Sequence, residues 1–161
     1  MSATGRNPSE VRKLIQQALD GATITGTAIQ VTLNKAADPL NPLIGGRECV
    51  DGAFVVVLSG ASSYRNITHN AGAVHIQHKF TYRVTVRCVF DVAACSPENM
   101  DADLYVVLEG LVDLIDDCLQ PLIGEQFEVL TVEFRTPERV IEVPEYLASE
   151  VTYVISEWWD K

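Results

Sequence analysis

Residues 74–91 alternate apolar and polar side chains with great regularity. The even positions from Val74 to Phe90 are mostly apolar, and the odd positions from His75 to Asp91 are mostly polar. Successive side chains of a β-strand point to opposite faces of the sheet. The pattern therefore predicts a long, half-buried strand, which we expect to be the central strand of an antiparallel sheet.

Two segments have apolar residues at helical spacing and recognisable ends. In the first, Asn7 is the expected N-cap, Pro8 the first helical residue and Gly21 the residue just past the end. The second is expected to begin after Ser96 and to stop at Pro121. Both helices are predicted to be amphipathic.

Shorter strand patterns occur on both sides of the second helix. They cover residues 27–33, 53–58, 126–134, 139–143 and 150–159, with a better apolar face at Leu130, Val132 and Phe134 in the third segment. Residues 34–46 and 59–72 are rich in turn-forming residues and are predicted to be long loops. The order indicates an α+β fold, with a mostly antiparallel sheet and two amphipathic helices packed on one face. We expect a single domain over residues 1–161, with residues 1–6 as a flexible tail.

The distribution of charge narrows the possible partners. The formal net charge is −10, and residues 88–134 contain eleven acidic residues and no Lys or Arg. Such a surface repels DNA and attracts basic partners, which argues against general nucleic-acid binding.

No apolar run approaches the roughly 20 residues that span a bilayer, and the first residues do not resemble a secretory signal. We therefore expect no membrane partner and a cytoplasmic site of synthesis.

The sequence contains no recognisable motif for a chemical reaction. His75 and His78 fall on opposite strand faces, and the four cysteines form no CxxC pair. Nucleophile elbows, P-loops and dinucleotide-binding fingerprints are missing from the sequence. Asp113, Asp116 and Asp117 are better interpreted as a solvated helix face than as a catalytic cluster. We expect no enzyme, no metal and no cofactor.

Lys79, Arg83 and Arg87 form a basic line on the polar face of the long strand. Neighbours in this line are about 13 Å apart at roughly 3.3 Å per residue. The line could be solvated, could contact phosphate, or could pair with the acidic helix of an adjacent subunit through Asp113, Asp116 and Asp117. Trp158 and Trp159, near the end of the chain, could pack on the sheet or lie in a subunit interface.

The order and character of these segments resemble a family of phage proteins. An opening helix (VRKLIQQAL), a long strand (HKFTYRVTVRCVF), an acidic helix (ADLYVVLEGLVDLIDDCL) and a closing strand (EVTYVISEWW) are arranged as in tail terminator and tail-completion (neck) proteins of tailed bacteriophages. The resemblance is to a plan of elements over most of the chain, and no functional residue is carried over from it.

The resemblance implies a structural role in a virion. It implies a homo-oligomer, expected to be a hexameric ring, that terminates the tail tube and joins it to the head–tail connector protein. Its partners would be the tail tube protein, the connector protein, and DNA that passes through the channel without specific binding. Assembly would take place in the host cytoplasm. A small nucleic-acid-binding module that uses Lys79, Arg83 and Arg87 is the alternative, and a small enzyme or ligand-binding protein is a third.

Overall fold

The computed structural model describes residues 7–27, 29–33, 52–91, 100–139 and 146–160. Two α-helices and five strands lie in these ranges, together with one short 3₁₀ segment. In chain order they are α1 (Pro8–Leu19), β1 (Val31–Leu33), β2 (Gly52–Asn70), β3 (Ala73–Asp91), α3 (Met100–Leu119), η2 (Gln120–Leu122), β4 (Phe127–Arg139) and β5 (Tyr146–Asp160).

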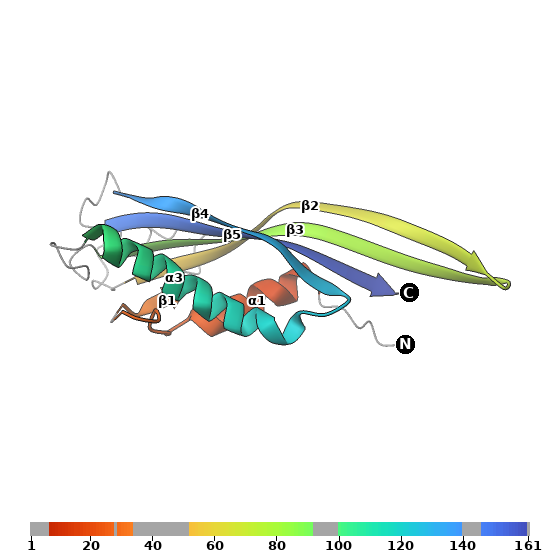
Figure 1. Ribbon diagram of the computed structural model, residues 1–161, viewed down its shortest axis with the longest axis horizontal. Coiled ribbons are helices and arrows are strands. Elements are labelled where there is room, and N and C mark those ends of the chain that lie inside the picture. The colour runs from red at the N-terminus through yellow and green to blue at the C-terminus, as the bar shows by residue number, and fades with distance from the viewer. Residues whose placement is uncertain (1–6, 28, 34–51, 92–99, 140–145, 161) are drawn as a thin grey trace.

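The strands form one sheet in the order β1-β2-β3-β5-β4. All neighbouring strands are antiparallel except β1 and β2, which are parallel. The two helices lie on one face of the sheet and contact each other (Figure 1). This confirms the predicted α+β fold and the central position of the long strand, β3.

The expected alternation of β3 is present where the helices cover it. Tyr82, Val84 and Val86 are buried on the helix side, whereas Arg83 and Arg87 are exposed on the outer side, with the buried Thr85 between the two arginines. The matching residues of β5 belong to the same core, because Val84 lies opposite Tyr153 in the register. Burial of one face of the sheet under the helices therefore holds the body of the protein together.

The ends of α1 are those that the sequence predicts. The side chain of Asn7 accepts a hydrogen bond from the backbone N–H of Glu10 at 2.9 Å, and Pro8 is the first helical residue. Val11, Ile15 and Leu19 form its buried stripe. Gly21 follows with a φ of +77°, a conformation that glycine adopts without strain. The strand predicted to follow is shorter than expected, since β1 covers only Val31–Leu33.

The second helix approaches the turn after α1 very closely at Gly110. A Cβ atom at Gly110 would overlap the carbonyl oxygen of Thr25 and lie 2.7 Å from Cγ2 of Ile24. The close neighbour of Gly110 is therefore this turn and not the sheet. α3 ends at Leu119, just before Pro121, as predicted.

The prediction of a loop over residues 59–72 is wrong. β2 continues through this segment to Asn70 and pairs with β3 as far as Ala73. The two strands form a hairpin that extends beyond the helices and β5 (Figure 1). We call residues 62–80 the arm; within it, β5 pairs only with residues 77–80, next to the body. Its turn has a positive φ at both Ala71 (49°) and Gly72 (79°), as in a type I′ turn.

A bulge explains why the sequence pattern concealed this strand. The pairing shifts by one residue between Ser59 and Ser62, where Gly60 has a φ of +58°. On the body side of the bulge the even residue Phe54 faces the helices, opposite Cys88, whereas in the arm the odd residue Ile67 lies opposite Ile76. The two-residue alternation of β2 therefore changes phase at Gly60.

A second bulge, in β4, changes which residues of that strand face the core. Pairing with β5 shifts between Val129 and Thr131, so Leu130 is the extra residue and is exposed. Phe127 is buried, and Val129 and Val132 pack against the core. Phe134 is 54% exposed although it was expected to belong to the apolar face.

Other sequence predictions fall outside the described residues. These are the tail 1–6, the loop 34–46, the cap at Ser96 and most of the strand 139–143.

Replacement of Gly110 by alanine should destabilise the fold, because the new methyl group meets backbone that cannot rotate away. We expect Gly110→Ala to lower the free energy of unfolding by roughly 1–3 kcal/mol, measured by urea denaturation. Gly124→Ala is the matched control: a Cβ atom at Gly124 would meet nothing within 4 Å beyond its chain neighbours, and the effect of this change should stay within about 0.5 kcal/mol. Equal stabilities of the two variants would contradict the close approach.

Candidate subunit interface

Lys79, Arg83 and Arg87 lie on the outer face of the sheet, away from the helices. Arg87 Nε donates to Glu150 Oε1 at 3.0 Å, directly across the β3–β5 pair, and Arg135 Nη1 lies 3.8 Å from the second oxygen of Glu150. Lys79 Nζ lies 5.0 Å from the ring centroid of Trp158. Two of the three residues in the basic line, Lys79 and Arg87, thus already contact side chains of their own chain.

Arg83 is the most available cation of the three. Its side chain is exposed, and no ion pair is found for it within the part of the chain that the structure describes. Its methylene groups pass beside Gly60, where a Cβ atom would lie 3.6 Å from Cδ of Arg83. Arg83 therefore lies beside the bulge at which the arm begins.

The predicted acidic residues lie on the opposite side of the sheet. Asp113, Asp116 and Asp117 are exposed on α3, which packs on the helix side. The Tyr153 hydroxyl donates to Asp116 Oδ1 at 2.9 Å, so Asp116 also ties α3 to β5. Because the sheet separates α3 from the basic line, these two sets of residues do not meet within one chain. Any pairing between them requires a second molecule.

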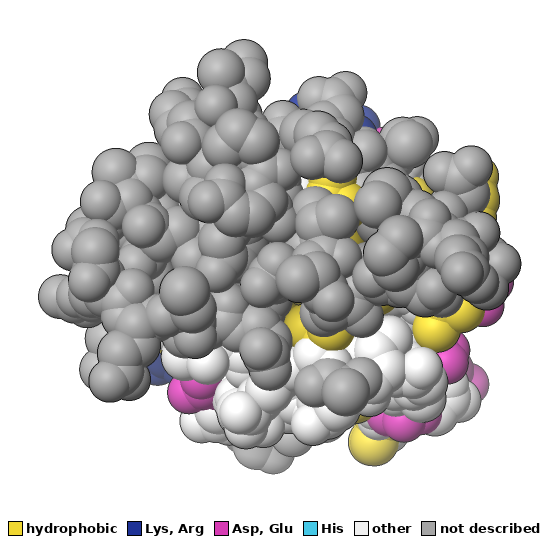
Figure 2. All heavy atoms as spheres, turned by 90° about the vertical axis from the view of Figure 1, so that its left-hand side faces the viewer, with side chains coloured by type: hydrophobic (Ala, Val, Ile, Leu, Met, Phe, Trp, Pro, Cys, Tyr) yellow, Lys and Arg dark blue, Asp and Glu magenta, His cyan; other side chains and the backbone are white. Residues whose placement is uncertain are grey.

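The end of the molecule away from the arm tip carries both acidic and apolar side chains. Acidic groups appear there between apolar ones, and much of the visible surface belongs to residues outside the described ranges (Figure 2). Among the described elements, α3 contains more acidic residues than any other, six, and no Lys or Arg.

The two tryptophans are placed by the pairing of β5 with β3. Trp158 is partly buried on the outer face, beneath Lys79. Trp159 lies opposite His78 in the β3–β5 register, and its side chain is outside the described part of the chain. Trp158 thus contacts Lys79 of its own sheet, and a place for the tryptophans in a subunit interface stays a prediction.

Two tyrosines are buried next to carboxylates on the helix side. Burial, followed by the negative charge of Glu157, raises the pKa of Tyr82. Burial, followed by the hydrogen bond to Asp116 and the charge of that residue, raises the pKa of Tyr153. Glu157 itself is 0% exposed. These surroundings favour the protonated phenols, and the hydrogen bond from Tyr153 to Asp116 connects β5 to α3.

Reactive groups are scarce in the described residues. No cluster of three or more His, Cys, Asp or Glu side chains there could hold a metal ion. Burial raises the pKa of the Cys88 thiol to about 12 and, with Asp116 and Asp117 nearby, that of Cys118 to about 11. Such thiols are poor nucleophiles at neutral pH. No described helix is both long and apolar enough to cross a membrane.

The arm is a candidate functional surface whose hairpin structure the sequence did not reveal. Ile67 and Val74 are 48% and 53% exposed there, on the same face of the hairpin. One signal was available: Gly72 follows Asn70 and Ala71, and a Gly-containing turn between strands of β-branched residues favours a hairpin.

Comparisons with models of protein families and with curated proteins gave no match for this chain.

The raised pKa values of Tyr82 and Tyr153 predict alkaline sensitivity. A phenol whose pKa is higher in the folded than in the unfolded state contributes stability below the unfolded value of about 10, and this is lost as pH rises further. We expect the free energy of unfolding to fall above about pH 10, and Tyr153→Phe to weaken that fall. Denaturation at a series of pH values measures both.

Tyr105→Phe is the matched control, because Tyr105 is 68% exposed. It should leave the pH dependence of unfolding unchanged. A spectroscopic titration in which all five tyrosines ionise together in the folded protein would contradict the burial of the two phenols.

Proposed function

We propose that the protein is a structural ring subunit of a tailed-phage virion, which terminates the tail tube and joins it to the head connector. In this role it is a homo-oligomer, expected to be hexameric, that contacts the tail tube protein and the connector protein. It is assembled in the host cytoplasm and stays in the virion. It needs no cofactor, catalyses no reaction and has no membrane partner.

The observation that carries the proposal is the arm. A two-stranded ribbon is marginally stable by itself in water, yet this one extends beyond the helices that cover the rest of the sheet (Figure 1). An element with exposed aliphatic side chains outside the core of its own chain is typical of a subunit that is completed by neighbours. The plan of helices and strands, which resembles that of tail terminator proteins, supplies the identity of the assembly.

The distribution of charge supports the same role. Residues 52–90 contain four Lys or Arg and no Asp or Glu, whereas α3 contains only acidic charges. Opposite charges at separate places on one chain favour association between copies. In a ring, acid-rich surfaces that face the channel would let DNA pass without binding, because like charges repel.

The nucleic-acid-binding alternative rests on that same basic hairpin. Two of its four cations, Lys79 and Arg87, already contact Trp158 and Glu150. Fewer cations are then left for phosphate. If the alternative is right, DNA affinity falls with salt at a logarithmic slope of about −0.9 per phosphate contact, and Arg83→Ala reduces that slope.

Electron microscopy tests the proposed function directly. Purified protein, alone or mixed with tail tubes of the phage that encodes it, should form rings, and tubes grown in its presence should end at a ring. Phage that lacks the protein should make tails of uncontrolled length. A protein that stays monomeric with and without tubes, in a phage whose tail length does not depend on it, would contradict the proposal.

A further inference from the structure

The helix-side face of the arm is apolar and uncovered. The even positions of β3 continue outward from buried Tyr82 through the partly exposed Phe80, His78 and Ile76 to Val74, which is 53% exposed, and all but His78 are apolar. Ile67 of β2 lies opposite Ile76 and belongs to the same face. The apolar stripe of the core therefore runs past the end of the helices.

Basic groups flank this apolar surface. Arg65 lies opposite His78, and His69 opposite Val74, so both share the face of Ile67. Arg65 is exposed, and no ion pair is found for it among the described residues. We call Arg65, Ile67, Val74 and Ile76 the arm face.

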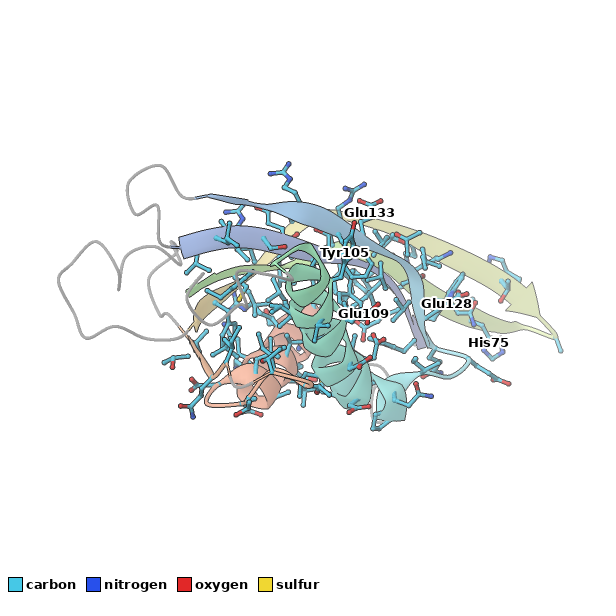
Figure 3. All side chains as sticks on the ribbon, turned by 60° about the vertical axis from the view of Figure 1, so that its left-hand side comes forward. His75, Tyr105, Glu109, Glu128 and Glu133 are labelled. Carbon is cyan, nitrogen blue, oxygen red and sulfur yellow. The ribbon has the colours of Figure 1, made fainter. Side chains whose placement is uncertain are left out.

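The α3 helix has an exposed surface of complementary character. Tyr105 is 68% exposed, and Glu109 and Asp113 follow it at four-residue spacing, also exposed. Residues four apart lie on one side of a helix. We call Tyr105, Glu109 and Asp113 the helix face; Tyr105 and Glu109 are labelled in Figure 3.

The two faces match in length as well as in charge. Tyr105 and Asp113 are separated by about 12 Å along the helix at 1.5 Å per residue. Arg65 lies opposite His78, four residues along β3 from Val74, so Arg65 and Val74 are separated by about 13 Å along the arm at roughly 3.3 Å per residue. Over a similar distance, the arm face combines three aliphatic side chains with the positive charge of Arg65, and the helix face combines the Tyr105 ring with two carboxylates.

The arm face and the helix face do not meet within one molecule. In Figure 1 the arm tip lies at one end of the long axis, and the N-terminal half of α3, which carries Tyr105, lies toward the other. A contact between two different surfaces at opposite ends joins copies head to tail, which closes into a ring when the rotation permits.

We propose that the arm face of one copy docks on the helix face of a second copy. Arg65 then faces Glu109 or Asp113, and Ile67 and Val74 pack against Tyr105. The inference deepens the proposed function, because it supplies the contact between ring subunits on which that function rests.

Two complementary variants test the contact in the full-length protein. Ile67→Asp disrupts the arm face and leaves the helix face intact, whereas Tyr105→Arg does the reverse. Each variant alone should be monomeric by sedimentation velocity at concentrations at which the wild type assembles, with an association constant lowered on the order of tenfold or more. An equimolar mixture should form dimers, because one intact arm face meets one intact helix face.

Thr68→Asp is the matched control. Thr68 is exposed on the arm but lies opposite His75, on the outer face. This variant should assemble like the wild type. Thermal unfolding followed by circular dichroism should give similar midpoints for all variants, since every altered side chain is exposed.

A charge exchange provides a second readout. Arg65→Glu and Glu109→Arg should each weaken assembly, and the double variant should restore it. The inference is overturned if both Ile67→Asp and Tyr105→Arg assemble like the wild type or if their mixture stays monomeric. A wild type that is monomeric at every concentration, with an arm that binds DNA or another protein instead, also overturns it.

These outcomes separate the contact from the proposed function. If the mixture forms dimers but the protein neither forms rings on tail tubes nor controls tail length, the contact stands and the virion role fails. If both variants still form rings on tubes, the virion role stands and the contact fails.

Discussion

The structure depends on the burial of one face of β3 beneath a helical layer that is shorter than the strand. β3 has 19 residues and α3 has 20, but they reach about 60 Å and about 30 Å, because the rise per residue is roughly 3.3 Å in a strand and 1.5 Å in a helix. The helices can cover only about half of the strand. The core, the arm and its exposed aliphatic residues all follow from this difference in length.

The sequence predicted the structure correctly wherever the local pattern and the tertiary packing agree. The alternation of β3, the cap at Asn7 and the stop at Pro121 each depend on neighbouring residues in the chain, and each is present as predicted. The arm and the exposed Leu130 were missed because both depend on bulges. A bulge adds one residue to a strand, so a two-residue period that is regular in space is interrupted in the sequence.

The candidate site could be predicted only in part, because local pattern again does not contain all the information. Strand alternation placed Lys79, Arg83 and Arg87 on one face, but their contacts with Trp158 and Glu150 depend on which strand lies next to β3. Cross-strand neighbours come from distant parts of the chain, and periodicity does not identify them. Likewise, the acidic helix and the basic strand can both be recognised in the sequence, but only the packing shows that the sheet lies between them.

The bulge at Gly60 constrains how the arm can vary in length. Ile67 faces the helix side because a fixed number of residues separates it from the bulge. Suppose that one residue is inserted into each strand of the arm, between the bulge and Ile67. Every side chain farther out would then turn to the other face of the hairpin, whereas an insertion of two residues per strand would leave each side chain on its present face. A lineage of such proteins could therefore lengthen or shorten its reach only in increments of about 7 Å, two residues at a time.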